Sequence, residues 1–388
     1  MKTIAIDVRL IGRNRTGDEA VFRNLVRSVL ELDRTDRFLL LTDRGDGESL
    51  TRLRTELGKD GRLPENAEIV TLPAGNRFMW NLVSVPLFLF RRGVDVFHTQ
   101  YILPSFIPRR TRVVTHIHDV SFRAFPEYVG ALDRLFLSIF IPRTMSRSDV
   151  LVAPSRFTKD EIISRYGVGE ERIVIVPNAV DPAFLVSPTP EDLARVRSRH
   201  ALPETFVLSV GTMQPRKNIP LLIRAFATLR KSHPNLGLVL VGGRGGKHYD
   251  RSIDDAIREE DLDDAVVFPG YVLQEDMPAL YALARVLCFP SRYEGFGIPI
   301  LEAFAAGIPV VASDIPPFRE VGGESALSFD PGNVVKCAES LYTLLIDENA
   351  RIRCERSGKD RLAGYSWASS ARDMLSCYMP SSSSVDKF

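Results

Sequence analysis

The sequence predicts an α/β protein made of two doubly wound domains, each a parallel sheet with helices on both faces. Short apolar runs alternate along the chain with amphipathic runs, as in repeated strand–helix–strand units. The strand-like runs are almost continuously apolar, which is typical of parallel strands covered on both faces. The alternation occurs twice, and 388 residues are enough for two domains.

The first series of strands fills the first half of the chain, which we assign as a domain of residues 1–183. Helical stretches separate several of the strands. In residues 19–32, for example, apolar side chains recur every three or four positions. The strand-like runs are TIAID, FLLLT, EIVTL, VDVFH, RVVTHIH, DVLVAP and RIVIVP.

The second series begins near residue 205 and predicts a second domain at residues 204–362. Its strand-like runs are FVLSVG, LGLVLVG, AVVFPG, VLCFP, PVVAS and ALSFD. Residues 184–203 hold prolines and charges and are predicted as a linker, and residues 381–388 as a disordered tail. Ligands of such sheets bind beyond the carboxyl ends of the strands, so we expect the domains to face each other across a cleft.

Composition excludes several classes of protein. Apolar residues make up 45% of the chain and charged residues 26%, as in soluble globular proteins, and the net charge of +1 gives no field that selects nucleic acid. The four cysteines lack Cys-x-x-Cys spacing, which favours reduced thiols. The start of the chain is typical of a strand rather than a signal peptide, and no run of 18 apolar residues exists. We expect a cytoplasmic protein with no nucleic-acid partner.

A basic pair stands where a helix is expected to begin, in GTMQPRKNIPLL. Gly211 ends a strand, Arg216 and Lys217 follow, and Asn218 with Pro220 is typical of a helix start. Cations are unfavourable at this end of a helix, which already carries partial positive charge, unless an anion binds there. We therefore favour a diphosphate site over a solvated basic turn.

Two acids flank a pair of glycines in EGFGIPILE. Glu294 falls in the loop after a strand, and Glu302 falls on the next helix among apolar neighbours. Gly295 and Gly297 allow the backbone to approach a ligand closely. Carboxylates accept hydrogen bonds from vicinal hydroxyls, so the pair suits a sugar ligand. The alternative is a loop acid and a surface helix acid.

These segments resemble family 4 of the retaining glycosyltransferases with the GT-B fold. The similarity is strongest at residues 206–331 and extends to most of the chain. It implies that residues 363–380 form a C-terminal helix that crosses back to the first domain. The matching segments are GTMQPRKN, FPGYV, PSRYEGFGIPILEAFAAGIPVVAS, PFREVGG, PNAVD and THIHDVSF.

The resemblance implies a nucleotide-sugar donor in the second domain. Glu294 would hold hydroxyls of the transferred hexose, Glu302 the ribose, and the basic pair the diphosphate. His118, with Asp119 beside it, would lie near the reacting sugar. The full donor-binding set implied is Gly17, Gly211, Arg216, Lys217, Tyr271, Val272, Glu294, Gly295, Phe296, Gly297 and Glu302.

Two further histidines precede His118. His116 is expected to point to the opposite face of the sheet, in a structural role. For His98, at the end of another strand, we favour packing over a place in the cleft.

No metal and no cofactor is expected besides the donor. The two cations would stabilise the negative charge that develops on the leaving diphosphate. The segment Asp261–Asp263 precedes a strand and is typical of a solvated acidic loop. Retention of anomeric configuration is implied by the family. Since no residue stands out as a covalent nucleophile, we expect a front-face reaction.

The loop after the first strand departs from the family pattern. It reads GRNRTGDEAVFRN, in which Gly17 matches, while Asp18 and Glu19 replace small residues. Acids stabilise a helix N-terminus, so capping explains them. They would also repel an anionic acceptor, which leaves acceptor choice open.

Two apolar segments raise the question of a membrane. Residues 77–93 and 131–147 are apolar with flanking arginines, which suits a peripheral contact with the inner face of a membrane carrying a lipid-linked acceptor. We favour packing of both segments on the first sheet.

The sequence predicts a metal-independent retaining hexosyltransferase that takes mannose from GDP-mannose to a glycan or lipid-linked glycan in polysaccharide synthesis. The alternative is a non-catalytic module that binds nucleotide sugar or glycan through a degenerate site. An epimerase would need a dinucleotide fingerprint, and a phosphorylase a pyridoxal lysine site; neither is found.

Overall fold

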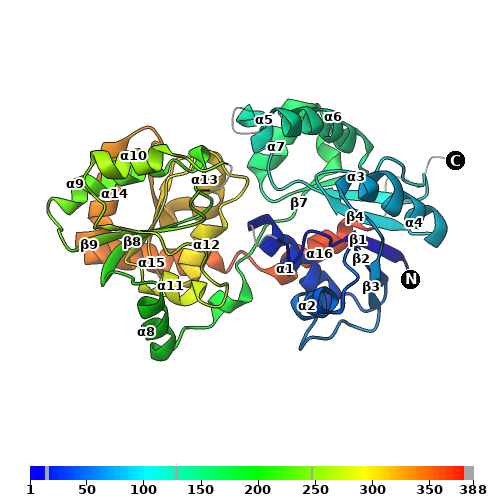
Figure 1. The fold of residues 1–388 in the computed structure, drawn as a ribbon, viewed down its shortest axis with the longest axis horizontal. Coiled ribbons are helices and arrows are strands. Elements are labelled where there is room, and N and C mark those ends of the chain that lie inside the picture. The colour runs from blue at the N-terminus through cyan, green and yellow to red at the C-terminus, as the bar shows by residue number, and fades with distance from the viewer. Residues whose placement is uncertain (14–16, 127–129, 246–247, 380–388) are drawn as a thin grey trace. The chain divides into compact units, whose positions relative to one another are not determined.

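The chain folds into two α/β units, and both predicted doubly wound domains are confirmed (Figure 1). The computed structural model describes residues 1–13, 17–126, 130–245 and 248–379. Unit 1 comprises Met1–Ala179 and Ser366–Phe388, and unit 2 comprises Val180–Tyr365.

The sheet of unit 1 is parallel throughout, with the order β3-β2-β1-β4-β5-β6-β7 in the described residues. Its first strand lies in the middle, so the chain winds outward to both edges. The strands are β1 Thr3–Asp7, β2 Arg37–Thr42, β3 Ala67–Thr71, β4 Val96–Gln100, β5 Arg112–His116, β6 Val150–Ala153 and β7 Ile173–Ile175.

Helices cover both faces of this sheet. They are α1 Gly17–Leu32, α2 Gly47–Leu57, α3 Arg77–Met79, the π-helical turn η1 Trp80–Ser84, α4 Val85–Arg92, α5 Ser121–Ala124, α6 Ala131–Arg147, α7 Arg156–Tyr166, the 3₁₀ turn η3 Glu170–Arg172 and α16 Trp367–Cys377. Because side chains alternate along a strand, Phe97 packs on the α4 side while His98 meets Phe22 of α1 on the other side.

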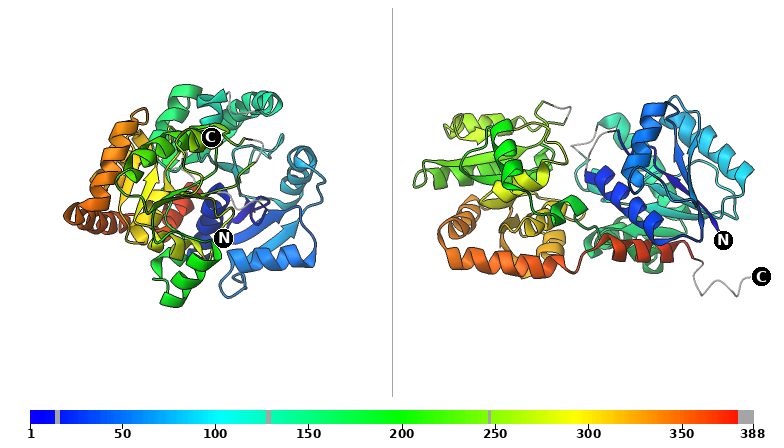
Figure 2. Two further views of the ribbon diagram at one scale, coloured as in Figure 1. Left: turned by 60° about the vertical axis from the view of Figure 1, so that its left-hand side comes forward. Right: turned by 90° about the horizontal axis from the view of Figure 1, so that it is seen from below.

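The last helix of the chain completes unit 1. Figure 2 shows α16, in red, beside α1, and the two helices are in contact. Beyond α16, Tyr378 is buried, and its hydroxyl is 2.8 Å from Nδ1 of His98 in β4. The segment from α16 to Tyr378 is therefore part of the core of unit 1.

Unit 2 has a second parallel sheet, with the order β10-β9-β8-β11-β12-β13 in the described residues. Strands β8 and β11 are neighbours at its centre. The strands are β8 Thr205–Val210, β9 Leu236–Val241, β10 Val266–Val267, β11 Val286–Phe289, β12 Val310–Ser313 and β13 Ala326–Phe329.

Two cores fill the faces of the second sheet. One joins the strands to the helices of residues 219–230 and 334–346, and the other to those of residues 277–283 and 298–305. The helical elements are η4 Pro182–Leu185, α8 Pro190–Arg199, η5 Pro215–Lys217, α9 Ile219–Arg230, α10 Ser252–Glu259, α11 Met277–Leu283, α12 Ile298–Ala305, α13 Pro316–Gly322, η6 Gly323–Ser325, α14 Val334–Ile346 and α15 Glu348–Leu362.

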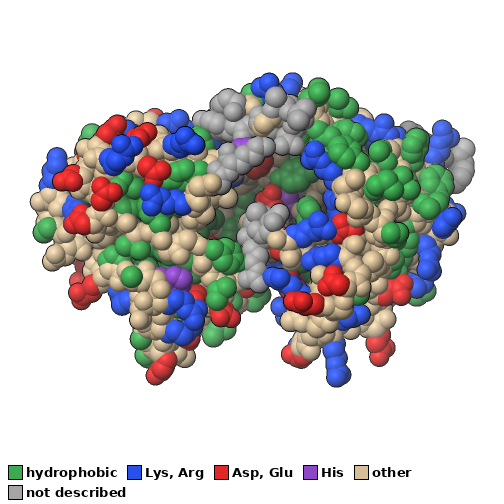
Figure 3. Space-filling view, in the orientation of Figure 1, with side chains coloured by type: hydrophobic (Ala, Val, Ile, Leu, Met, Phe, Trp, Pro, Cys, Tyr) green, Lys and Arg blue, Asp and Glu red, His purple; other side chains and the backbone are tan. Residues whose placement is uncertain are grey.

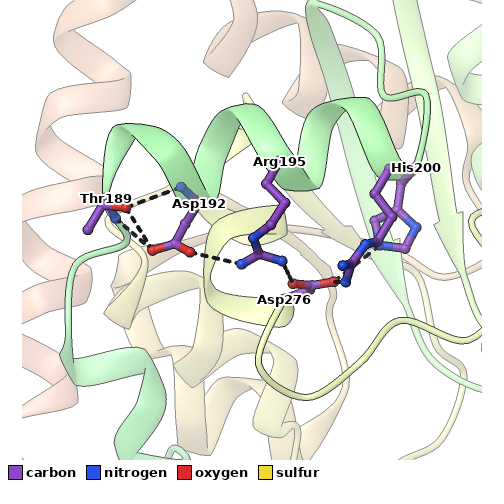
Figure 4. Close-up of polar contacts among 6 residues, drawn as sticks. Thr189, Asp192, Arg195, His200 and Asp276 are labelled. Carbon is purple, nitrogen blue, oxygen red and sulfur yellow. Dashed lines mark hydrogen bonds and ion pairs between the residues drawn. The ribbon is translucent and has the colours of Figure 1, made fainter.

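The segment predicted as a linker, residues 184–203, instead belongs to unit 2. It contains α8, which begins with a capping box between Thr189 and Asp192 and packs on α11 (Figure 4). The buried carboxylate of Asp276 receives hydrogen bonds from Arg195 at 2.5 Å and from Arg199 at 2.7 Å. Prolines and charges here mark a capped helix tied down by ion pairs, which explains why the composition resembled that of a linker.

The two apolar segments of unit 1 are only partly packed. Trp80, Val85 and Leu89 are buried against the sheet, as favoured above, whereas Leu87 and Phe90 are 45% and 57% exposed. In the part of the chain that the structure describes, no helix is both long and apolar enough to span a bilayer.

Candidate functional site

In unit 2 the basic pair forms a short turn between β8 and α9. Arg216 and Lys217 end the 3₁₀ turn η5, and Asn218 follows with a left-handed φ of 57°. Asn218 precedes the first residue of α9, as predicted, but its side chain does not cap the helix. It donates instead to the carbonyls of Pro290 and Pro331, at 3.1 and 2.9 Å. Asn218 thereby fixes the basic turn to the loop after β11.

The loop after β11 brings Glu294 to the basic pair. Nη1 of Arg216 lies 3.0 Å from Oε2 of Glu294, and Nζ of Lys217 lies 2.5 Å from Oε1. Nη1 of Arg216 also donates to the carbonyl of Tyr293 at 3.1 Å. Three of the predicted site residues, 77 and 78 positions apart in sequence, thus form one ion cluster beyond the carboxyl ends of β8 and β11.

The two cations of this cluster determine the charge state of Glu294. Burial alone would raise the pKa of the Glu294 carboxyl, but Lys217 and then Arg216 outweigh it and lower the pKa to about 2. Glu294 is therefore ionised at neutral pH, and one carboxylate faces two cations. Two cations and one hydrogen-bond acceptor side by side suit an anionic ligand that also carries hydroxyls.

Two glycines make room for the cluster. Gly211 directly follows β8 with φ +152°, and a Cβ there would meet Cε and Nζ of Lys217 at 3.3 and 3.4 Å. Gly297 precedes α12 with φ +117°, and a Cβ there would lie 3.0 Å from the ring of Phe318. A side chain at either position would displace the groups that shape the site.

Glu302 lies on α12, as predicted, in a different electrostatic environment. The hydroxyl of Tyr281, in α11, donates to Oε2 of Glu302 at 2.5 Å. Burial raises the pKa of the Glu302 carboxyl to about 7, the Tyr281 hydrogen bond opposes the rise, and Asp181 adds to it. Glu302 thus changes its charge near neutral pH, whereas Glu294 does not.

The other predicted donor residues of unit 2 lie in two places. Phe296 is buried beside Gly295 in the loop that leads into α12, and its ring meets that of Tyr365 edge-on. Tyr271 and Val272 follow β10, and Tyr271 is exposed while Val272 is buried in the core that includes Phe296. The place of Tyr271 near the base of a donor remains a prediction.

In unit 1, His118 lies just beyond the end of β5. It is 5% exposed, and its Nε2 is 2.7 Å from Oε1 of Gln100, the last residue of β4. Burial lowers the pKa of the His118 imidazole to about 3, so the ring is neutral at physiological pH. Asp119 accepts hydrogen bonds from the backbone and hydroxyl of Ser121, which holds the following turn.

The expectation that His116 points to the opposite face was wrong. The rings of His116 and His118 stack at 4.3 Å with an interplanar angle of 23°. Residues two apart share a face of a strand, and β5 ends at His116. His98 is fully buried in contact with Tyr378, so the packing role favoured for it is confirmed.

The acids in the first turn of α1 have partners within unit 1. Oε1 of Glu19 accepts from the backbone N–H of Gly12 at 2.7 Å, and Oδ2 of Asp18 accepts from the hydroxyl of Tyr101 at 3.3 Å. Gly17 is the first residue of α1, and a Cβ there would contact nothing within 4 Å. Glu19 is thus bound to the backbone at Gly12, and the capping explanation for the two acids remains a prediction.

Sequence reasoning missed three side chains of these groups. Tyr281, Gln100 and Tyr101 each contact a predicted residue through a side chain or a ring. Tyr281 and Gln100 stand in segments with no distinctive motif, so only the fold brings them to Glu302 and His118. For Gln100, its place at the carboxyl end of a parallel strand was the available signal.

No metal site emerges. Within the described ranges, no three His, Cys, Asp or Glu side chains are arranged to hold a metal ion. The sequence-based expectation that the reaction needs no metal remains a prediction.

Models of two protein families match the two units. A model described as "Glycosyltransferase Family 4" matches residues 17–184, and one described as "Glycosyl transferases group 1" matches residues 191–361. O-antigen chain mannosyltransferase B of Escherichia coli is 31% identical over 71% of this chain and 72% of its own. Serotype-specific mannosyltransferase WbdA of Escherichia coli is 29% identical over 66% of this chain, which spans only 30% of that longer protein.

Solved structures share the fold over nearly the whole chain. Sucrose-phosphate synthase from Thermosynechococcus elongatus superposes with a TM-score of 0.75 at 21% identity, covering 97% of this chain and 98% of that one. HepE of Anabaena, solved in complex with UDP-glucose, superposes with a TM-score of 0.73 at 20% identity, covering 97% and 99%.

Proposed function

The chain belongs to family 4 of the glycosyltransferases, and on that premise we propose that it transfers mannose from GDP-mannose to a glycan or lipid-linked glycan, with retention of configuration and without a metal. Its activity as a glycosyltransferase follows from the family; the donor, the acceptor and the mechanism are our proposal. The observation that carries it is the cluster of Arg216, Lys217 and Glu294 in unit 2.

The cluster suits the leaving group of this reaction. Cleavage of the donor places negative charge on a nucleoside diphosphate and positive charge on the anomeric carbon. Arg216 and Lys217 are held in place before any ligand arrives, so they can stabilise that diphosphate without reorganisation. Two cations could supply the charge that a metal ion provides in other enzymes, which supports a metal-independent reaction.

The carboxylates suit hydroxyl recognition rather than covalent chemistry. Glu294 is a weak base, because its pKa is about 2, and it is already bound to two cations. It is better suited to accept hydrogen bonds from sugar hydroxyls than to attack carbon. This supports the front-face reaction, in which an oxygen of the donor phosphate accepts the proton of the acceptor.

The choice of mannose rests on relatives. Two curated relatives are named mannosyltransferases, and one of them is an O-antigen chain enzyme. HepE was solved with UDP-glucose, which supports a nucleotide-sugar donor and leaves its base and sugar to be tested. Selectivity between epimers depends on few contacts.

A donor panel tests this proposal. We expect GDP-mannose to raise the melting temperature of the chain by several degrees at 100-fold excess over Kd, and more than UDP-glucose does. At the same ligand concentration, Lys217→Ala should reduce the shift by about half or more, whereas Lys336→Ala, which removes an exposed cation of α14, should leave it unchanged. No shift with any nucleotide sugar would overturn the proposal. Binding without transfer to pooled glycan acceptors would favour the non-catalytic module.

A surface of unit 1 supports the further proposal of contact with an anionic membrane. Large apolar side chains, 45–66% exposed, cover the outer side of α3, η1, α4 and α6 and the loop before β5; we call them the apolar patch (Figure 3). The patch consists of Phe78, Met79, Leu82, Val83, Leu87, Phe90, Phe106, Leu135 and Ile139.

Contacts join the three segments of the patch into one surface. The rings of Phe78 and Phe136 meet at 5.8 Å. The backbone N–H of Ser105 donates to the carbonyl of Asn81 at 2.9 Å, and Arg143 of α6 donates to the carbonyl of Ser105. No acidic residue occurs in residues 72–94 or 101–118, where six arginines do, so the surroundings suit anionic lipid headgroups.

Vesicle flotation tests the membrane contact. We expect the chain to float with vesicles rich in anionic lipid at low salt and less with zwitterionic vesicles. Phe90→Ser with Phe106→Ser should reduce flotation, while Val335→Ser with Ile352→Ser, also exposed, should not. No flotation at low salt would refute the contact. A change of oligomeric state in the first variant would instead assign the patch to self-association.

A further inference from the structure

The His118 ring is fixed from three sides within unit 1. The ring of His116 stacks on it at 4.3 Å, and the ring of Tyr101 lies 5.6 Å away at an angle of 49°. Oε1 of Gln100 is 2.7 Å from Nε2 of His118. Two rings and one amide leave the imidazole a single orientation.

The hydrogen bond to Gln100 also determines where the proton sits. Oε1 of Gln100 faces Nε2 of His118, and since an amide oxygen only accepts, this arrangement favours the hydrogen on Nε2. Since the ring is buried and neutral, Nδ1 then holds a lone pair and acts as an acceptor. The other tautomer would place the lone pair of Nε2 against the lone pairs of Oε1.

We propose that Gln100 is a positioning residue that fixes His118 in the Nε2–H tautomer, so that Nδ1 accepts a hydrogen bond from a substrate hydroxyl. The tautomer is a property of unit 1 alone. Only the hydroxyl rests on the proposed function.

The backbone at Gln100 supports this role. Tyr101, directly after it, has a φ of 55°, in the left-handed region that bulky residues rarely adopt. The N–H of Tyr101 donates to the carbonyl of His116, and that of Ile102 donates to the carbonyl of Gln100 at 2.6 Å. This turn fixes the backbone directly after Gln100, in a conformation that a tyrosine adopts only at a cost in strain.

The surroundings explain an amide rather than a carboxylate at position 100. His98 of β4 and His116 of β5 are neutral, since burial, and then the nearby histidines, lower the pKa of each ring well below its usual value. Burial, and then the charges of Asp18 and Asp119, raises the pKa of the Tyr101 hydroxyl well above its usual value. A glutamate at position 100 would stabilise the imidazolium and remove the acceptor.

Nitrogen NMR of the full chain tests the tautomer directly. With ¹⁵N-labelled histidine, one of six, identified by its loss in His118→Gln, should show a protonated Nε2 and an unprotonated Nδ1 near pH 7. In Gln100→Leu the ring should exchange between both tautomers, so that the ¹⁵N chemical shifts of Nδ1 and Nε2 move towards their average. The control Thr99→Val, on the same strand, should leave them unchanged. A wild-type Nδ1–H tautomer, or the same tautomer in Gln100→Leu, would overturn the proposal.

Kinetics separates positioning from folding. In variants with unchanged thermal unfolding, Gln100→Leu should lower kcat about threefold to tenfold while the affinity for the nucleotide diphosphate stays constant. Gln100→Glu should keep Nε2–H but shift the imidazole titration upward, so that activity falls as the pH is lowered. An unchanged titration in Gln100→Glu would count against the hydrogen bond. A chain without transferase activity would refute the proposed function but leave the NMR result valid.

Discussion

At the scale of single residues, Glu294 and Glu302 differ in the charges that surround them. Two cations hold the pKa of Glu294 at about 2 against the effect of burial, whereas burial dominates at Glu302 and raises its pKa to about 7. Two glutamates eight positions apart therefore behave differently: Glu294 is ionised throughout the neutral range, whereas Glu302 titrates within it. Substituting each glutamate in turn should separate these two roles.

Replacing Glu294 should separate nucleotide binding from sugar transfer. Glu294→Gln removes the carboxylate and leaves Arg216 and Lys217 with one fewer negative partner. We expect the affinity for GDP, measured by calorimetry, to stay equal or rise, while kcat falls on the order of 100-fold. Lys217→Ala is the opposite control and should weaken GDP binding at least tenfold. Loss of GDP affinity in Glu294→Gln would contradict the assignment.

Glu302 should make stability depend on pH near neutrality. Its folded pKa of about 7 lies above the value of 4.5 expected when unfolded, so the folded state binds more protons between these pH values. The wild-type chain should lose stability as pH rises through this window, and Glu302→Gln should not. The variant should gain on the order of 1 kcal/mol relative to wild type between pH 5 and pH 8. Urea unfolding at both pH values measures this.

Glu324 is exposed, and Glu324→Gln provides the control for these unfolding measurements. The difference in unfolding free energy between this variant and the wild type should not change with pH.

The ionisation of Glu302 should also affect nucleotide binding. If Glu302 holds ribose hydroxyls as an anion, nucleotide affinity should fall as the pH drops below 7 in the wild type and be insensitive to pH in Glu302→Gln. An affinity that rises on acidification would argue against that role.

At the scale of elements, helix α8 is held to unit 2 by one buried acid. Asp276 has no exposed surface and lies against Arg195, Arg199 and, at 3.7 Å, His200 (Figure 4). Burial raises the pKa of its carboxyl, but the hydrogen bonds from the two arginines outweigh it and lower the pKa below 3.8. The contribution of this carboxylate to stability is thus present at neutral pH and lost only in strong acid.

Asp276→Asn should destabilise unit 2 by about 2–3 kcal/mol, because it leaves the arginines without their buried partner. Asp255→Asn, which removes an exposed partner of Arg258, should cost less than about 0.5 kcal/mol. Denaturant unfolding of both variants at pH 7 makes the comparison. Equal effects would mean that α8 does not depend on this cluster.

At the scale of the whole molecule, the two units differ in how the chain builds them. Unit 2 is continuous, whereas unit 1 needs both ends of the sequence. Trp367, Met374 and Tyr378 from the second end are buried in unit 1, and Nε of Arg112 donates to the carbonyl of Cys377 at 2.9 Å. A truncation after Tyr365 should therefore damage unit 1 and spare unit 2.

We expect loss of residues 366–388 to destabilise unit 1 by on the order of 5 kcal/mol, from the exposed apolar area alone. Calorimetry should show one unfolding transition for each unit, and only the transition of unit 1 should move to lower temperature in the truncated chain. Residues 180–365 expressed alone should fold. The truncation control is removal of residues 380–388 only, which should leave both transitions in place. If the longer truncation left the transition of unit 1 unchanged, α16 would be dispensable for its stability.

The sequence by itself determined the two parallel α/β units and the identity of most candidate residues. Apolar runs must be buried, and the period of the pattern separates strands from helices, so the elements follow from local order. The basic pair and Glu294 could be selected because cations at a helix start, and an acid beside glycines in a largely apolar segment, are locally unfavourable without a ligand. The same reasoning failed at residues 184–203, where composition cannot distinguish a linker from a helix held by a distant acid.

Only the tertiary structure decided which groups meet. The pairing of Lys217 with Glu294, the bond from Tyr281 to Glu302 and the contact of Gln100 with His118 join residues 18 to 77 positions apart. Opposite pKa shifts at two identical side chains follow from these contacts. Burial and electrostatic partners depend on distance in space, which a parallel sheet sets by strand order rather than by sequence order.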